Sequence, residues 1–403
     1  MDLIDVWQLQ IFACDMITVD IKLLIENIYG IFRFEANKYG GLTTVSKKKK
    51  FLGFCLVFVF VLAYFVSFFI DISEPDQMVS SVDKVYRVPF TILTMQYVLL
   101  AFNSFKDDQA NISMSIFLTL MKIDQKLTMN LNQDKLSRKQ VINVLILCTV
   151  CTLFLFVFDI YFRVDFDITI IVAFFIYYER IIETFFFCFL IRLLILRLGL
   201  VNNYLSFFVR NNCKNKNWFT IINKSLKLRE LNVNFIGSAS PQNCKIGELI
   251  QVYCMIGETC KAVNCVFNVQ ILMTLMSTFA YIVITIWSSI YYFHTDGNYI
   301  DALITIIVWC VVEVLLIGVL CGFSEYLLIK RNYTKVFVNE IIMNYDLPET
   351  MRIQAKTFME MIDVWTFDIL VFDMIKIDIK LMLKFLSVAT TYLIVIIQAS
   401  NFI

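Results

Sequence analysis

Seven long apolar stretches constrain the fold of this chain more than any motif does. They cover residues 51–70, 85–105, 141–162, 168–190, 266–293, 301–323 and 383–402. About 20 apolar residues in a helix cross the hydrocarbon core of a membrane, and a helix satisfies its own backbone hydrogen bonds there. The hydrophobic fraction of the chain is 59%, above the roughly 45–50% of a soluble domain. We therefore expect an all-α integral membrane protein, a seven-transmembrane helix bundle.

Positive charges predict the orientation of this bundle. Of the 35 Lys and Arg residues, 7 fall in 1–50, 6 in 106–140, 9 in 196–265 and 8 in 324–384. Positively charged loops stay in the cytoplasm, so we expect the amino terminus to be cytoplasmic and the carboxyl terminus extracellular. The predicted parts are a cytoplasmic amino-terminal segment (1–50), a six-helix transmembrane bundle (51–323) with cytoplasmic segments 106–140 and 196–265, further cytoplasmic helices (324–382) and a seventh helix (383–403).

The most specific motif lies in the seventh apolar stretch. The sequence TTYLIVIIQ, Thr390 to Gln398, has Thr-Tyr followed by five apolar residues and Gln. It resembles the carboxyl-terminal signature of insect gustatory receptors, although Ala399 stands where that signature usually has Phe. The residues leading into the motif also resemble the family: Ile377, Asp378 and Leu381. Near the amino end, NIYGIFRFE (27–35) is similar to the start of moth members.

The resemblance implies a ligand-gated, poorly selective cation channel in the plasma membrane of chemosensory neurons. It implies a homo- or hetero-tetramer of gustatory receptors, with a pore lined by the seventh helix and a small-molecule tastant bound within each subunit. The cytoplasmic parts of the later helices would form an anchor, to which we assign Trp365, Asp378 and Leu381. Sugar-sensing members tend to have an acidic residue after Thr-Tyr, and Leu393 stands there. This favours a bitter or other non-sugar tastant.

Helical spacing in the seventh stretch suits a pore. Thr391 and Gln398 are seven residues apart, which places them about 20° from each other on one helix face. Ile394 and Val395 lie between them on the same stripe. If copies of this helix surround a shared axis, their Gln398 amides form a ring around a water-filled path. The neighbouring Ile394 and Val395 side chains form an apolar band, which can close the path by excluding water. The alternative is that Gln398 hydrogen-bonds a neighbouring helix. Tyr392 falls on another face, where we expect it to pack against a helix.

Polar and aromatic residues at membrane depth are candidates for a ligand pocket. We assign to it Gln96, Tyr177, Trp287, Tyr291, Trp309 and Glu313. The alternative for the aromatic residues is that they mark the membrane interface, where Trp and Tyr are enriched. For Glu179, Glu183 and Arg180 we expect a structural pairing. The chain has one His, and we predict no metal site, cofactor, nucleic-acid partner or enzymatic activity.

The chain carries nearly the same sequence near both ends. Residues 1–24 repeat residues 359–382, and twelve of the twenty-two positions from 4 to 25 are identical to those from 362 to 383, Trp7 and Trp365 among them. We expect the second copy to be an amphipathic cytoplasmic helix that leads into the pore helix. The first copy is either an extra helix that docks on the anchor or the tail exon of a neighbouring paralogue joined to this chain.

Two other classes of protein share the hydropathy pattern. A G-protein-coupled receptor would have the opposite orientation, and the chain has no Asp-Arg-Tyr after the third stretch and no Asn-Pro-x-x-Tyr in the seventh. A secondary transporter more often shows a duplicated set of spans, whereas the repeat here covers one predicted cytoplasmic segment. Both remain alternatives to the channel.

Overall fold

The computed structural model describes residues 35–36, 42–43, 45–73, 81–127, 146, 149–157, 168–210, 240–294 and 300–399. Its helices are α2 (Lys47–Ser73), α3 (Ser81–Ser104), α4 (Asp107–Leu127), α6 (Ile168–Arg210), α9 (Lys245–His294), α10 (Ile300–Met343), α11 (Glu349–Val364) and α12 (Ile379–Ala399). Two short antiparallel hairpins are β1 (Glu35–Ala36) with β2 (Leu42–Thr43), and β3 (Leu370–Val371) with β4 (Ile375–Lys376). The first copy of the repeat lies outside the described residues.

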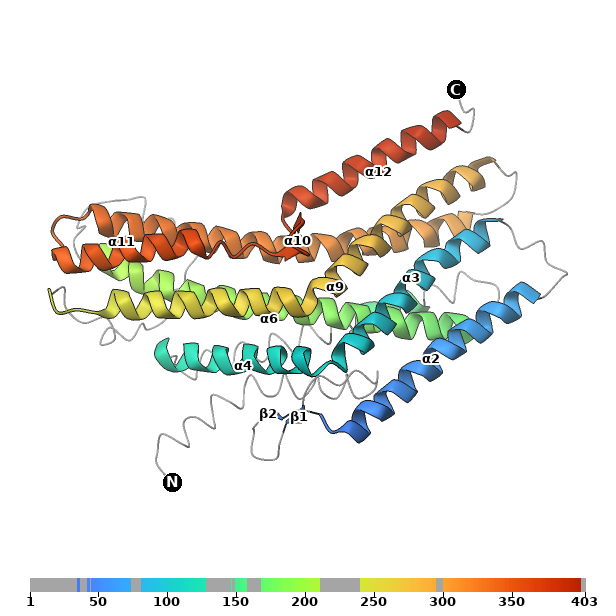
Figure 1. Cartoon of the computed structure of the whole chain (residues 1–403). Helices are drawn as coiled ribbons and strands as arrows, with labels where there is room; N and C mark the ends of the chain where they lie inside the picture. The colour runs from blue at the N-terminus through green and yellow to red at the C-terminus, as the bar shows by residue number, and fades with distance from the viewer. Residues whose placement is uncertain are drawn as a thin grey trace.

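Three helices are much longer than a membrane is thick. Helices α6, α9 and α10 have 43, 50 and 44 residues, which at 1.5 Å per residue makes them about 65–75 Å long, and they run side by side (Figure 1). The predicted spans 168–190, 266–293 and 301–323 are thus only parts of them. Much of the predicted segments 106–140 and 196–265 is helical as well, in α4 and in the ends of α6 and α9.

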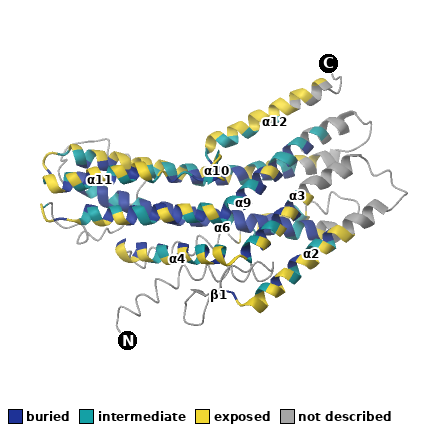
Figure 2. Cartoon of the chain, in the orientation of Figure 1, coloured by how far each residue is buried: buried dark blue, intermediate teal, exposed yellow. Residues whose placement is uncertain are grey.

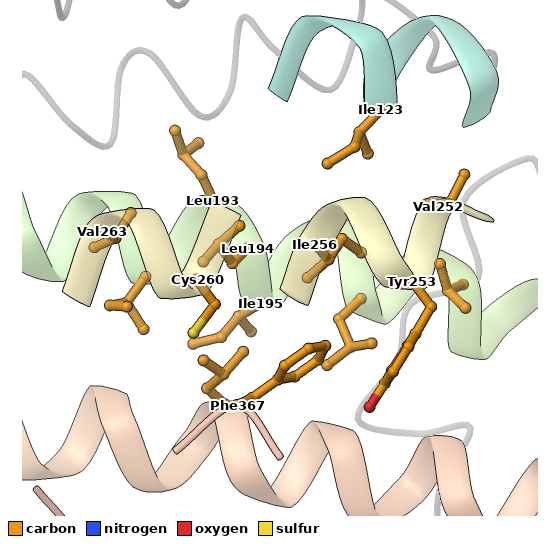
Figure 3. Close-up of a cluster of buried hydrophobic side chains, with 14 of the residues drawn as sticks. Ile123, Leu193, Leu194, Ile195, Val252, Tyr253, Ile256, Cys260, Val263 and Phe367 are labelled. Atoms are coloured by element: carbon orange, nitrogen blue, oxygen red, sulfur yellow. The ribbon is translucent and has the colours of Figure 1, made fainter. Parts of the chain in front are cut away.

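The main hydrophobic core lies in the part of the bundle where these long helices meet α4 and α11. Figure 3 shows its centre, with side chains contributed by α4, α6 and α9 and with Phe367 entering from the chain after α11. The ring of Tyr253 stacks on Phe367 with 4.8 Å between ring centroids. Fully burying one such side chain stabilises the fold by about 1.5–3 kcal/mol.

Four of the described helices are long and apolar enough to cross a membrane. The qualifying stretches are Lys47–Val66, Ile171–Val209, Lys245–Ile284 and Ile307–Met343. More than half of residues 47–66 of α2 are exposed although this stretch is apolar (Figure 2), which is the pattern of a helix that faces lipid. The predicted stretches 85–105 and 383–402 also coincide with helices, α3 and α12. The all-α membrane fold is thereby confirmed.

The prediction of an amphipathic helix over residues 362–382 is wrong. Helix α11 ends at Val364, and the chain then runs through the β3–β4 hairpin before α12 begins at Ile379. Phe367, Ile369 and Val371 are buried, and this period of two is the pattern of an extended strand. The helices predicted for 324–382 are therefore the end of α10 and α11, followed by a hairpin.

Candidate functional site

Helix α12 packs against α9 and α10 by one face only. Its half-buried described side chains are Leu381, Met382, Phe385 and Ala389. With about 100° per residue, these positions lie on one side of the helix. The Sδ of Met382 is close to Gly318 of α10, where an added Cβ would lie 3.6 Å from it.

The four predicted pore residues lie on the opposite, exposed side of α12. Thr391, Ile394, Val395 and Gln398 are all exposed, and Figure 2 shows how little of α12 is covered. The predicted packing of Tyr392 is confirmed, because its ring meets Phe279 of α9 edge to face at 5.7 Å.

Sequence reasoning missed the part of this exposed stripe nearest the amino-terminal end of α12. Ser387, Lys384 and Lys380 continue the face of Thr391 at helical spacings of four, three and four residues, and all three are exposed. The spacing alone could have revealed them. The stripe is therefore polar at both ends and apolar at Ile394 and Val395.

The β3–β4 hairpin holds the start of α12 against α9. Asn264 of α9 donates its amide to the carbonyl of Leu370 at 2.8 Å, and one turn further Asn268 accepts from the backbone N–H of Phe372 at 2.7 Å. The turn needs this support, because Phe372 and Asp373 have φ angles of 49° and 57°, which side chains other than Gly rarely adopt. The two asparagines thus clamp a strained turn.

The predicted anchor residues Asp378 and Leu381 form the cap of α12. The Oδ1 of Asp378 accepts the backbone N–H of Leu381 at 2.9 Å, the bond by which an N-cap residue satisfies a free helix donor. Leu381 also packs against the main core. The Asp378 carboxylate thus caps the start of α12 by bonding to the backbone N–H three residues later.

Trp365, the third predicted anchor residue, lies against Gly257 of α9. A Cβ on Gly257 would come within 2.5 Å of the indole, so only Gly permits this approach. The carbonyl of Trp365 accepts from the hydroxyl of Tyr253 and from Nε of Arg331, each at 3.2 Å. Nearby, a hydrogen bond from Lys335 lowers the pKa of the Asp363 carboxyl.

Three of the predicted ligand-pocket residues lie together between α6 and α10. The ring of Tyr177 meets Trp309 edge to face at 4.8 Å. The guanidinium of Arg180 lies over the Tyr177 ring at 4.6 Å and forms an ion pair with Glu313. Tyr177, Arg180 and Glu313 are at most 1% exposed. The cluster therefore places aromatic faces beside a buried charge pair.

The helix α9 completes this cluster with hydroxyl groups. Arg180 donates to Ser277 at 2.9 Å, and Thr278 donates to Oε2 of Glu313 at 2.9 Å. Both carboxylate oxygens of Glu313 thus have partners. The ion pair that Arg180 forms with Glu313 joins two helices, α6 and α10. Adjacent residues on a helix do not face each other.

Of the other predicted pocket residues, the structure places Gln96 beside the same stretch of α9. Gln96 of α3 donates to Thr274 of α9 at 3.4 Å, one turn from Ser277 and Thr278. Trp287 is half-buried in α9. Tyr291 belongs to α9, but its side chain lies outside the described residues.

The sequence of nearly the whole chain fits one family of receptors. Residues 27–400 match the sequence profile of the 7tm chemosensory receptor family. The chain belongs to this family. No curated protein matches it.

A solved structure shows that this chemosensory receptor has a known fold. The structure of the insect olfactory receptor OR5 from Machilis hrabei in complex with eugenol has a TM-score of 0.59 to the chain at 12% sequence identity, covering 93% of this chain and 95% of that one. At this identity the likeness concerns the fold. It confirms the chemosensory receptor architecture predicted from the Thr-Tyr signature.

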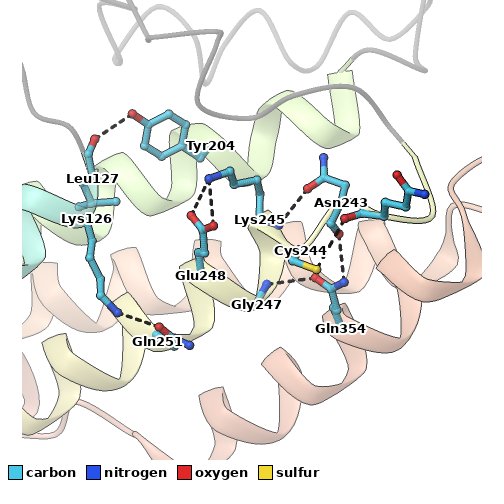
Figure 4. A network of polar contacts seen from close by, with 11 residues as sticks. Lys126, Leu127, Tyr204, Asn243, Cys244, Lys245, Gly247, Glu248, Gln251 and Gln354 are labelled. Carbon is cyan, nitrogen blue, oxygen red and sulfur yellow. Dashed lines mark hydrogen bonds and ion pairs between the residues drawn. The ribbon is translucent and has the colours of Figure 1, made fainter.

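The receptor has a second polar region far from the Arg180 cluster. Figure 4 shows Gln354 of α11 bridging to the start of α9: it accepts from the N–H of Gly247 at 3.1 Å and donates to the carbonyl of Asn243 at 3.0 Å. On α4, Lys126 donates to Gln251 at 2.7 Å. A buried ion pair of 2.5 Å between Arg197 and Asp124 joins α6 to α4. Direct bonds thus connect the helices in this half of the receptor.

Proposed function

We propose that this receptor is a ligand-gated, non-selective cation channel that responds to bitter or other non-sugar tastants. It acts as a homo- or hetero-tetramer with other gustatory receptors in the plasma membrane of chemosensory neurons. Its amino terminus is cytoplasmic and its carboxyl terminus extracellular. In each subunit α12 lines the pore, and the Tyr177, Trp309 and Glu313 cluster contributes to the tastant pocket.

The two faces of α12 are the observation that carries this proposal. One face packs on α9 and α10, and the opposite face carries Thr391, Ile394, Val395 and Gln398 in exposed positions. An amide that faces lipid loses its hydrogen bonds at a cost of several kcal/mol. Copies of α12 around a shared axis would instead direct the Gln398 amides into water.

The order of residues along the stripe supports a gate. The side chains of Ile394 and Val395 would form an apolar constriction, which closes a pore by excluding water. Gln398 lies one turn beyond it, where amide groups can replace part of the hydration shell of a cation. A slight rotation of α12 on its packed face would widen the constriction.

Charge substitutions at Gln398 test the pore assignment. In voltage-clamped cells with a stimulating tastant, Gln398→Glu should raise the permeability of Ca²⁺ relative to Na⁺, and Gln398→Lys should lower cation current at least roughly tenfold, because a ring of like charges attracts or repels the ion at close range. Gln398→Asn keeps the amide and is the matched control. Identical conductance and reversal potential in all three variants would exclude Gln398 from the ion path.

The pocket assignment rests on chemistry as well as position. Aromatic faces bury the rings of a largely apolar compound, and a few fixed polar groups orient it. The eugenol in the structurally similar olfactory receptor is an example of a small molecule bound by a receptor of this fold. Trp309→Ala should shift the tastant concentration for half-maximal current by roughly tenfold or more, as expected for loss of an aromatic contact. An unchanged dose–response curve at normal surface expression would argue against this pocket.

A further inference from the structure

A small cavity between α3 and α9 lies apart from the Tyr177, Trp309 and Glu313 cluster. The volume open to the centre of a water-sized sphere is about 20 Å³. Its lining mixes apolar residues with five polar ones, which are Gln96, Asn103 and Ser104 from α3, Gln109 from the start of α4 and Gln270 from α9. The cavity therefore extends from within the bundle to the corner where α3 turns into α4.

Two buried amide oxygens in this lining lack a donor. Gln96 is 2% exposed and Gln270 is 5% exposed. The Oε1 atom of each has no hydrogen-bond partner among the residues that the structure describes. Gln96 uses its amide nitrogen toward Thr274, which leaves its oxygen for another group. A buried acceptor without a donor costs about 1–3 kcal/mol.

The size and the chemistry of the cavity fit one kind of occupant. A water molecule needs about 10–15 Å³ by this measure of volume and two to four polar partners. It has two hydrogens to donate, and the cavity offers two oxygens that require donors. A tastant is too large for this space, and no carboxylate belongs to the described lining to attract a cation.

We propose that this cavity is a binding site for an ordered water that bridges Gln96 of α3 and Gln270 of α9. The water donates one hydrogen to each Oε1. The site joins α3 to α9 at Gln270. In the same stretch of α9, Asn264 and Asn268 bind the hairpin before α12. Gln96 consequently serves the packing of α3 on α9 and does not line the tastant pocket.

Near-isosteric substitutions test the bridge. In the purified full-length receptor, Gln96→Met and Gln270→Met should each lower the melting temperature, because each leaves the other amide oxygen unsatisfied. The double variant should recover most of the loss, since it leaves neither oxygen behind. Gln125→Met, an exposed amide on α4 outside the cavity, is the matched control and should leave the melting temperature unchanged.

A dry cavity gives the opposite pattern. Each single substitution would then remove an unsatisfied oxygen and raise the melting temperature, and the two increases would add. That result would overturn the proposal. A density map of the receptor gives an independent readout. A peak within hydrogen-bond distance of both oxygens is expected, and its absence in a map that shows other buried waters would also overturn the bridge.

Discussion

Helices α6 and α12 are similarly apolar but differ in their surroundings. In the most apolar 18-residue segment of α6, which lies within Ile171–Val209, 72% of the residues are buried inside the chain. None of the described residues of α12 is buried, although α12 is at least as apolar overall. Figure 2 shows the contrast directly. Hydropathy identifies a membrane helix, but it does not say whether the helix is surrounded by its own chain.

The distribution of polar residues separates the two helices. The buried charges of α6 have partners within the chain, as Arg180 has in Glu313 and Arg197 in Asp124. The polar residues of α12 gather on the face turned away from α9 and α10, at Lys384, Ser387, Thr391 and Gln398. A helix of the first kind completes a core, whereas one of the second kind needs water or other subunits on its polar face.

The largest expected loss of stability follows from breaking the buried ion pair between Arg180 of α6 and Glu313 of α10. Glu313→Leu leaves the Arg180 guanidinium buried without its carboxylate, and removing one partner of a buried ion pair costs about 3–5 kcal/mol. We expect the variant to be retained inside the cell or to melt at a clearly lower temperature. Surface labelling and a thermal unfolding curve of the purified receptor measure this.

A double substitution distinguishes this explanation from a general intolerance of the site. Arg180→Met combined with Glu313→Leu removes both charges and keeps similar volumes, and such replacements are often neutral or stabilising. The double variant should therefore regain surface expression. If it is as unstable as Glu313→Leu alone, packing at position 313 and not the ion pair carries the effect.

The sequence was informative about spans and less informative about partners. Apolar length predicted the helices that α2, α3, α6, α9, α10 and α12 form, and the Thr-Tyr signature predicted the family. The pairing of Arg180 with Glu313 was out of reach, because it depends on how α6 is rotated against α10. Helical spacing on one sequence can only pair residues within the same helix.

The residues of the hairpin before α12 gave only an ambiguous signal for a strand. Apart from Asp368, residues 367–371 are all apolar, and a short apolar run of this kind fits either a buried strand or a buried helix segment. The prediction of an amphipathic helix depended on the spaced acidic residues, which would form one polar face if the segment were helical. The turn at Phe372 gave no such signal, because Phe rarely adopts a positive φ, and its support comes from Asn268 on a distant part of the chain.

The second largest loss of stability and current should come from disturbing the contact between Trp365 and Gly257. Gly257→Ala places a Cβ within 2.5 Å of the indole, and overpacking of this kind costs about 1–3 kcal/mol. Displacing Trp365 moves the hairpin and with it the start of α12. We expect reduced tastant-evoked current and a lower melting temperature. Gly322→Ala, where an added Cβ on α10 has nothing within 4 Å, is the matched control and should change neither quantity, whereas equal losses in both variants would mean that the clash with Trp365 is not the cause.

A smaller effect, confined to conduction, is expected from the polar end of α12. If α12 lines the pore as proposed, Lys384→Glu replaces a repelling ring of charges near the start of α12 by an attracting one and should raise single-channel cation conductance up to a few fold, less at high salt. Lys356→Glu, on the exposed surface of α11, makes the same change of charge as a control. Equal conductance in both variants would place Lys384 outside the ion path.

The first copy of the repeat, near the amino end, differs from the second copy at positions that are buried in the second. The match to the chemosensory receptor family begins at residue 27, after the first copy, and the second copy already fills the surface between α9 and α10. Ala13 and Val19 stand where the docked copy has Val371 and Ile377. The smaller side chains bury less area, at about 0.8 kcal/mol for each CH₂, so the first copy is the weaker competitor.

Deleting residues 1–24 should accordingly have the smallest effect of all. We expect the same tastant-evoked current and the same melting temperature as for the full chain. Sequencing the 5′ ends of the transcripts shows in parallel whether the messages encode these residues at all. A deletion that changes gating while surface expression stays constant would contradict this expectation, because it would mean that the first copy docks on the receptor despite its poorer fit.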